Sequence, residues 1–387
     1  SWYSTETARI WIYNATWFEA IMVFFVINFV GNIARYNLLK KEKWAILILH
    51  LSWILIILGA FVTRYISFEG MMPIREGNTE NVFYSDKTYL TVYVDGEINN
   101  EPKRKILEDD ILVTTEAIKS NLPWNSDFNG QPFTISYAGF IEGAKEGLVE
   151  DPNGKEYLKI VEAGDGQRHE HYLENGEVSS IHNVLFSLNK MTEGAINIIE
   201  SDGNYQIKSP FEGQFMRMAD QLVIPEPIIK GAYGVISIPE NEKTENDLDA
   251  LIVDISSNGE TVRKKLLGAK GVANFSGEFK VGGLDFNISY GSKVYTLPFG
   301  IKLNDFIAEK HPGTENSYAS FMSKVTIEDE RPFDYDIYMN HILDHKGYRF
   351  FQASFNQDEK GTILSVNHDF WGTWITYIGY FLLYAGL

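Results

Sequence analysis

The chain has 387 residues, a formal net charge of −18 at pH 7 and no cysteine. Without cysteine it can form no disulfide and exchange none with a partner, and its negative charge argues against nucleic acid as a partner. The acidic balance fits simple colloidal solubility, or the attraction of a basic, unfolded protein partner.

Two apolar runs near the start of the chain predict membrane-spanning helices over residues 16–34 and 44–63. About 20 residues at roughly 1.5 Å rise cross the hydrocarbon core of a bilayer. The loop between them, residues 35–43, has a net charge of +3 from four basic residues and one acidic residue: Arg35, Lys40, Lys41, Lys43 and Glu42. Because short Lys- and Arg-rich loops stay in the cytoplasm, we expect residues 1–15 and the residues after 63 to lie outside.

The second apolar run contains a histidine, His50, with little water available to its imidazole. Ionisable residues at membrane depth are functional-site candidates by default. His50 lies about 9 Å along the helix axis from Trp44, in the half of the membrane nearer the cytoplasm. The apolar residues on its face of the helix, Trp53 among them, form a flat wall that suits a porphyrin or another helix. An interhelical hydrogen bond, worth about 1 kcal/mol, is the structural alternative.

Residues 64–368 form a polar region large enough for one core or two smaller ones. Alternating apolar residues bounded by Gly, Asn and Asp predict strands at residues 89–94, 133–137, 157–161, 234–238, 251–255, 286–290 and 362–366. Residues 303–310 and 215–222 are the best short helix candidates, and the polar stretch 240–249 indicates an exposed loop or subdomain boundary. The predicted fold is a membrane protein with α-helical spans and a large, mostly antiparallel β domain outside the membrane.

A third apolar run, residues 369–387, re-enters the membrane and is barely long enough to cross it. We expect this helix to be truncated and the chain to be a piece of a longer polypeptide. His368 and Asp369 lie where the chain re-enters the membrane. His368 could therefore face a ligand at the outer membrane surface, or serve as a polar anchor at the interface.

Four of the other six histidines form two pairs with metal-ligand spacing. His169 and His171 would share one face of a strand, and His341 and His345 one face of a helix. Neither pair has a third ligand at a recognisable spacing, so surface or capping roles are favoured. His182 and His311 are isolated. No nucleotide-binding loop, hydrolase elbow, His-Glu-x-x-His or Cys-x-x-Cys-His motif occurs, so classical hydrolase and nucleotide chemistry are unsupported.

The order of these parts resembles the ResB/CcsB family of system II cytochrome c biogenesis. The resemblance covers essentially the whole chain, and five stretches carry it: Trp-Phe-Glu at 17–19, Leu-His-Leu-Ser at 49–52, and the stretches 69–77, 340–355 and 361–369. Each motif alone is modestly specific, but their order and spacing together are distinctive.

The resemblance implies haem export coupled to haem attachment. In this family haem b enters from the cytoplasmic side and is held between one membrane histidine from CcsB and one from its partner CcsA. It is then joined to the Cys-x-x-Cys-His motif of apocytochrome c. The CcsB histidine corresponds to His50, which becomes an axial ligand of haem iron with Trp53 as part of the haem wall. The external ligands and the tryptophan-rich motif belong to the CcsA half, where the attachment chemistry is centred, so whether this chain is itself an enzyme stays open.

The partners implied are CcsA, fused or separate, apocytochrome c, membrane lipid and an extracytoplasmic thiol oxidoreductase. The location implied is the inner, cytoplasmic membrane with the large domain in the periplasm. The loop lysines and Arg35 could meet the haem propionates. A cytochrome b subunit would normally carry paired membrane histidines, and this chain has one. The other alternative is a structural adaptor that docks apocytochrome or a thiol-reducing partner and binds no haem.

Overall fold

The computed structural model describes residues 3–98, 101–164, 167–201, 204–212, 228–244, 247–313 and 317–387. Its contacts divide the chain into two compact units. Unit 1 comprises Ser1–Glu142 and Leu248–Leu387, and unit 2 comprises Gly143–Asp247. The end of unit 2 lies within the polar stretch 240–249, where the sequence indicates a loop or subdomain boundary.

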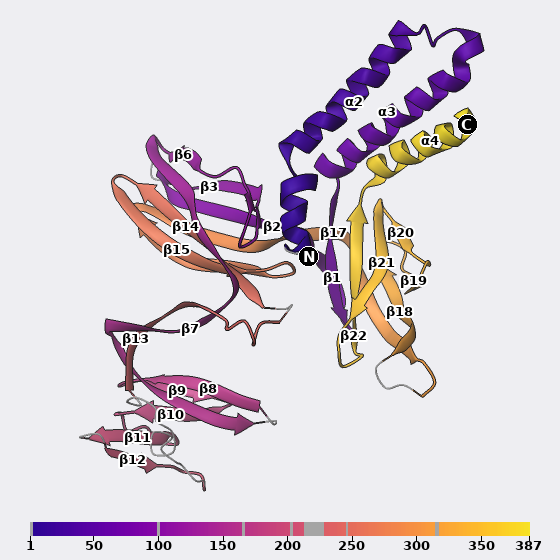
Figure 1. Ribbon diagram of the computed structural model, residues 1–387. Coiled ribbons are helices and arrows are strands. Elements are labelled where there is room, and N and C mark those ends of the chain that lie inside the picture. Colours follow the sequence, from indigo (N-terminus) through magenta and orange to yellow (C-terminus); the bar gives the residue numbers. More distant parts are fainter. Residues whose placement is uncertain are drawn as a thin grey trace. The chain divides into compact units, whose positions relative to one another are not determined.

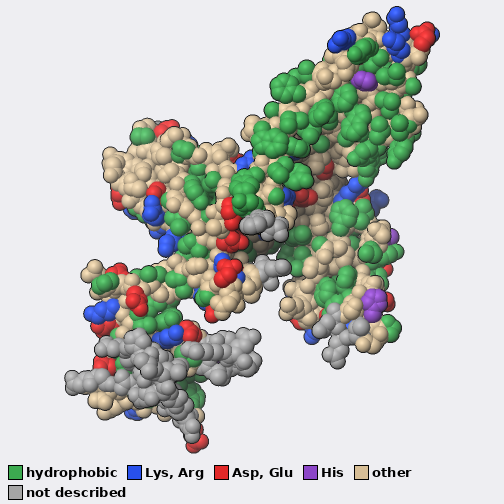
Figure 2. Space-filling view, in the orientation of Figure 1, with side chains coloured by type: hydrophobic (Ala, Val, Ile, Leu, Met, Phe, Trp, Pro, Cys, Tyr) green, Lys and Arg blue, Asp and Glu red, His purple; other side chains and the backbone are tan. Residues whose placement is uncertain are grey.

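The helices of unit 1 are mostly apolar (Figure 1). Their bounds are α1 Thr5–Ala8, η1 Arg9–Tyr13, α2 Thr16–Arg35, η2 Lys41–Lys43, α3 Trp44–Tyr65 and α4 Phe370–Gly386. Among the described residues, Thr16–Arg35 and Lys41–Tyr65 are long and apolar enough to cross a membrane, and α4 has 17 residues. Hydrophobic side chains cover these helices, and Lys and Arg gather at the tip of the α2–α3 connection (Figure 2).

Unit 1 is built around a ten-stranded sheet whose paired neighbours are antiparallel. Its main path runs β19-β18-β17-β2-β1-β22-β21-β20, with β16 on β17 and β3 on β2. The bounds are β1 Phe68–Arg75, β2 Thr79–Ile98, β3 Glu101–Asp110, β16 Ala273–Val281, β17 Leu284–Lys310, β18 Tyr318–Glu328, β19 Phe333–Tyr338, β20 Leu343–His345, β21 Tyr348–Phe355 and β22 Gly361–His368.

The remaining strands form smaller sheets. In unit 1 these are β4 Leu112–Val113, β5 Ile118–Lys119, β6 Trp124–Phe128, the first part of β7 Gln131–Gly164, β14 Leu248–Ser257 and β15 Glu260–Gly268. Unit 2 holds the rest of β7 with β8 Gln167–Glu174, β9 Val178–Ile181, β10 Val184–Leu188, β11 Ile196–Ser201, β12 Asn204–Lys208 and β13 Ile228–Ser237. The predicted fold class, apolar helices with a large antiparallel β domain, is confirmed.

Unit 1 contains two separate hydrophobic cores. The first lies where β2 and β17 meet β7 and β14, and includes Val92, Phe133 and Val253. The second lies along the rest of β17 with β1, β18, β21 and β22, and includes Phe350 and Val366. Alternate residues of each strand point inward, as the period of two requires. The second core lies directly beside the strands that continue into the helices.

The predicted helix at 303–310 is wrong, because these residues form the end of β17. Leu303 and Phe306 are both buried although they are three residues apart. The register with β18 shifts between Leu303 and Asp305, which marks a β-bulge at this point. The extra residue gives a strand the i, i+3 spacing of a helix face. The candidate helix at 215–222 lies outside the described residues.

The sheet and the helices are joined through two neighbouring strands. β1 follows α3 after two residues, β22 runs directly into α4, and β1 and β22 pair along their whole length from Phe68↔His368 to Arg75↔Gly361. Thr63 of α3 donates a hydrogen bond of 2.6 Å to Asp369, which also caps α4 at Gly372. The ends of α3 and α4 are therefore fixed at the ends of two central strands of the sheet.

Three glycines of α4 face small residues or backbone of α3. A Cβ added to Gly372 would lie 2.3 Å from Thr63 Oγ1, and one added to Gly379 would lie 2.8 Å from Ile56 and 3.2 Å from the Ser52 carbonyl oxygen. Gly386 in turn approaches Leu49. These glycines recur every seven residues, the period that keeps one face of a helix against its neighbour. Small residues of this kind let membrane helices approach closely.

Candidate functional site

His50 lies on a face of α3 that α4 does not cover. The α3 residues closest to the α4 glycines are Leu49, Ile56 and Thr63. At 3.6 residues per turn, His50 is rotated by roughly 100–140° from them. Its side chain is half-buried in the described structure. The face of α3 that carries His50 can therefore be reached by another helix or by a bound group.

One ring nitrogen of His50 is already engaged within α3. Nδ1 lies 2.8 Å from the carbonyl oxygen of Ile46, four residues earlier. A carbonyl oxygen only accepts hydrogen bonds, so Nδ1 carries the proton and donates it. In a neutral imidazole the other nitrogen, Nε2, then has the lone pair that a metal needs. Histidine ligands of metals typically donate their second nitrogen to a carboxylate or a backbone carbonyl in this way.

Aromatic rings surround His50 on the side of α2. The ring of Phe29 from α2 lies 5.5 Å from the imidazole at 87°, and 6.4 Å from Trp53 in a nearly parallel arrangement. Phe25 stacks on Phe29 in turn, with 6.4 Å between ring centroids. Trp53 was expected beside His50 because both lie on one face of α3. Phe29 was not expected, since no sequence signal shows which α2 residue meets that face.

An ion pair joins α2 to α3 at the ends that lie nearest the β domain. Arg64 Nη2 lies 2.5 Å from Glu19 Oε1, and Arg64 Nη1 donates to the carbonyl oxygen of Tyr13 at 2.7 Å. Both charged side chains are about one quarter exposed. The pair holds α2 beside α3, and so holds Phe29 near His50. In sequence Glu19 marks only the start of a helix, and its partner is 45 residues away.

His368 lies in an aromatic cluster at the end of β22. Its ring stacks on Phe68 at 4.7 Å and lies 4.4 Å from Tyr348. Phe68 stacks in turn on Tyr295 at 4.6 Å. These contacts place His368 where β22 meets α4, at the position expected from the sequence, but its ring faces are in contact with protein side chains.

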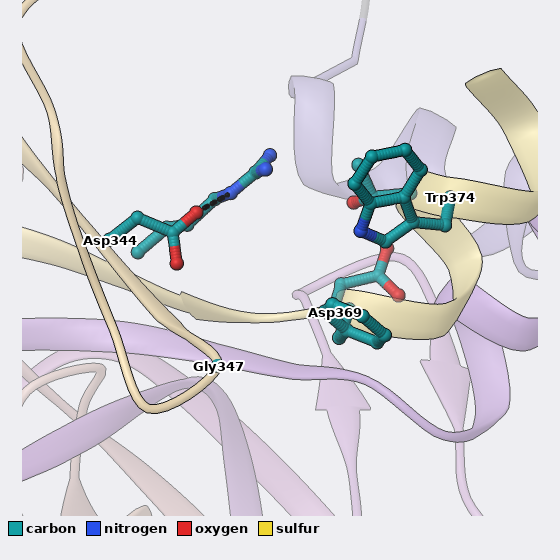
Figure 3. A pocket seen from close by; sticks show the side chains of 7 residues that line it. Asp344, Gly347, Asp369 and Trp374 are labelled. Carbon is teal, nitrogen blue, oxygen red and sulfur yellow. Dashed lines mark hydrogen bonds and ion pairs between the residues drawn. The ribbon is translucent and has the colours of Figure 1, made fainter.

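A recess beside this cluster is lined by charged residues and by the first turn of α4. Its volume is about 200 Å³, and Figure 3 shows Asp344 and Trp374 on its opposite sides. Seven residues line it: Asp344, Gly347, Arg349, Asp369, Phe370, Thr373 and Trp374. Arg349 Nε donates to Asp344 Oδ2 at 3.0 Å.

The expected pairing of His341 and His345 on one helix face is wrong. His345 lies in β20, and His341 lies in a turn, stacked on Tyr335 and Tyr338 with centroids 4.9 and 4.5 Å away. His345 Nε2 lies 2.8 Å from Asp329, which also binds Lys346 at 2.7 Å.

The other histidine pair, His169 and His171, lies on a strand as expected, in β8. The His171 ring lies 5.5 Å from that of His182, while the side chain of His169 lies outside the described residues. His311 begins the turn after β17. Within the described ranges, no group of three or more His, Cys, Asp or Glu side chains could hold a metal ion.

The fold defines a class of protein in which apolar helices carry a large antiparallel β domain. One histidine, His50, lies within the apolar helix α3. Residues 268–387, from the end of β15 to the end of the chain, match the family model described as the ResB-like family. Over this C-terminal part, the chain is similar to the ResB-like family.

A second comparison covers the whole chain. The chain is 26% identical over 388 residues to Protein NrfI of Wolinella succinogenes. The alignment includes 100% of this chain and 31% of that protein. The chain therefore spans about a third of the length of the curated relative. The family whose model matches is the one that the sequence motifs resemble.

Proposed function

We propose that this chain is the CcsB/ResB part of a system II cytochrome c maturation machinery, and that it carries haem b across the membrane together with a CcsA partner. His50 is an axial ligand of the haem iron through Nε2. The observation that carries this proposal is the hydrogen bond from Nδ1 to the Ile46 carbonyl oxygen, which leaves Nε2 as the nitrogen with a lone pair.

The surroundings of His50 support a haem on this face of α3. Phe29 and Trp53 offer nearly parallel aromatic faces beside the imidazole, and a porphyrin needs apolar walls next to its axial ligand. The α4 side of α3 is packed against glycines, so the haem lies on the other side. Haem with two axial ligands needs a second residue, which the CcsA half supplies.

In this proposal α2 and α3 span the cytoplasmic membrane with their connecting loop inside and the β domain outside. The positive loop supports this orientation, and it places His50 nearer the side from which haem enters. Arg35, Lys40 and Lys41 are exposed around this loop, where they can meet the haem propionates. Apocytochrome c docks outside, its thiols kept reduced by a separate oxidoreductase because this chain has no cysteine.

Replacing His50 by glycine tests the proposal. In His50→Gly the ligand is lost, so haem that co-purifies with the CcsB–CcsA assembly falls and cytochrome c maturation falls with it. Imidazole in the medium fills the gap and restores part of both. Leu51→Gly is the matched control: it places the same glycine, with about 1 kcal/mol of helix penalty, on an exposed neighbour in α3. Haem content per folded molecule that stays unchanged in His50→Gly contradicts the ligand assignment.

The second candidate function is a structural adaptor that holds apocytochrome or a thiol-reducing partner and binds no haem. The large acidic β domain favours it, since this surface attracts a basic partner. An adaptor purified with CcsA would lose no haem on replacement of His50. It would instead lose folded protein, without rescue by imidazole.

A further inference from the structure

The recess between β20, β21 and α4 combines opposite charges with aromatic rings. Arg349 and Asp344 form an ion pair on one side, with side chains 30% and 54% exposed. Phe370 and Trp374 of α4 line the other side, and each is about half exposed. Burial opposes the charge of Arg349, but its hydrogen bonds to Asp344 and Tyr377 raise the pKa of the guanidinium above its usual value. Arg349 is therefore a permanent cation here.

The position of the recess corresponds to the headgroup layer of a bilayer that α4 enters. Arg349 pairs in register with Asn367, three residues before α4 begins at Phe370. Three strand residues cover about 10 Å, and the headgroup region adds about 5–8 Å on each side of the hydrocarbon core. The Arg349 backbone therefore lies at or beyond the outer surface of the headgroups, and its side chain lines the same recess as Trp374, a residue type enriched at membrane interfaces.

The charges of the recess select against a simple anion. Its three ionisable residues are Asp344, Arg349 and Asp369, two carboxylates against one guanidinium. Asp369 already accepts hydrogen bonds from Thr63 and from the Gly372 backbone N–H, whereas Asp344 is the more exposed carboxylate. A ligand with one negative and one positive group can meet Arg349 and Asp344 together.

The size of the recess limits the ligand further. Pockets for drug-sized ligands hold roughly 300–1,000 Å³, and this recess holds about 200 Å³. A whole porphyrin is too large for it, but a small headgroup fits. The aromatic rings on the α4 side then contact the glycerol and upper acyl region of the same molecule.

We propose that this recess binds the headgroup of an outer-leaflet phospholipid that carries a phosphate and a primary ammonium, as phosphatidylethanolamine does. The phosphate pairs with Arg349, whose planar guanidinium matches phosphate oxygens, and the ammonium pairs with Asp344. Trp374 and Phe370 contact the apolar part of the lipid. The bound lipid links β21 to the first turn of α4. This inference rests on the membrane orientation of α3 in the proposed function, because α4 packs along α3, but it does not rest on the binding of haem.

Lipid retention tests the site. The full chain is reconstituted with equal amounts of phosphatidylethanolamine, phosphatidylcholine and phosphatidylglycerol, purified in detergent, and its bound lipids are counted by mass spectrometry. We expect phosphatidylethanolamine to be enriched about two- to fivefold, the range of an exposed ion pair. Arg349→Gln removes the enrichment. Asp344→Asn shifts the preference to phosphatidylglycerol, because the lining then carries no net charge.

The control is the matched ion pair of the β14–β15 hairpin, where Arg263 Nε lies 2.7 Å from Asp254. Arg263→Gln and Asp254→Asn leave lipid retention unchanged, and His50→Gly also leaves it unchanged, so failure of haem binding does not affect the result. Equal retention of the three lipids by the wild type overturns the proposal. A loss of binding of added haem in Arg349→Gln also overturns the proposal, because it would show that the recess holds the haem propionates.

Discussion

At the scale of single residues, the two nitrogens of His50 have different roles. Nδ1 donates to the Ile46 carbonyl oxygen at 2.8 Å, and this hydrogen bond holds the ring at one tautomer. Nε2 is then the nitrogen that can bind iron. Unsatisfied polar groups are costly in hydrocarbon, so a ligand or partner at Nε2 stabilises this face of the helix.

Asp329 gives a prediction about stability in acid. Hydrogen bonds from Lys346 and His345 hold the pKa of Asp329 well below its usual value of 3.8. A carboxyl group whose pKa is lower in the folded state stabilises the fold above pH 3.8, and this contribution is lost as the pH falls below that value. We expect Asp329→Asn to lower the melting temperature at pH 6 and to have a smaller effect at pH 3.

Thermal melts of the detergent-solubilised protein between pH 3 and pH 7 measure this difference. Asp305→Asn serves as the control, because Asp305 is half exposed and makes a single ion pair of 3.3 Å with Lys324. An Asp329→Asn variant that loses equal stability at both pH values would show that the Asp329 cluster does not depend on ionisation.

The sequence alone identifies His50 as the candidate ligand, but it does not identify most of the residues that pack around it. His50 stands out because its own helix is apolar, and Trp53 follows from the 3.6-residue period of that helix. Phe29 and the Glu19–Arg64 pair depend on how α2 packs on α3. Such contacts between helices are set by tertiary packing, so a single sequence does not reveal them.

At the scale of elements, the contact between α3 and α4 gives a prediction about packing. A Cβ at Gly379 would lie 2.8 Å from Ile56 and 3.1 Å from its backbone nitrogen. Gly379→Leu therefore separates the two helices, and we expect a loss of about 1–3 kcal/mol in the free energy of unfolding. Gly31→Leu is the control, since a Cβ at Gly31 in α2 meets nothing within 4 Å. Equal destabilisation of both variants would contradict the close α3–α4 packing.

The strand predictions succeed where side chains alternate strictly, as in residues 89–94 of β2 and 286–290 of β17. The failure at 303–310 has a local cause. The register shift near Leu303 breaks the alternation and puts Leu303 and Phe306 on one side. A bulge depends on the partner strand β18, which no pattern within residues 303–310 encodes.

At the scale of the whole molecule, the orientation in the membrane can be measured. Protease added to intact spheroplasts should cut within residues 64–368 and leave the loop around Lys40 and Lys41 uncut, because the proposed orientation places the positive loop inside. Permeabilised cells provide the control, in which both regions become accessible. Protection of the entire β region in intact spheroplasts would reverse the proposed orientation.

The sequence predicts the apolar helices and the β region more readily than it predicts the division of the chain into two units. Long apolar runs and a polar β region are visible directly, and the boundary near Asp247 coincides with a polar stretch. The interruption of unit 1 by Gly143–Asp247 is not visible, because β7 continues from one unit into the other without a break in its strand pattern. Sheet pairing over more than 100 residues, such as β2 with β17, likewise needs the structure.

The most direct test of the central claim is to identify the nitrogen bound to the iron. His50→Gly assembled with CcsA and supplied with ¹⁵N-labelled imidazole regains haem, and pulsed electron paramagnetic resonance of the ferric, low-spin form reads the nuclei coupled to the iron. We predict a ¹⁵N coupling of axial-ligand size in His50→Gly and only ¹⁴N coupling in the wild type under the same conditions. Haem bound in His50→Gly with ¹⁴N axial coupling alone would show that His50 is not the ligand.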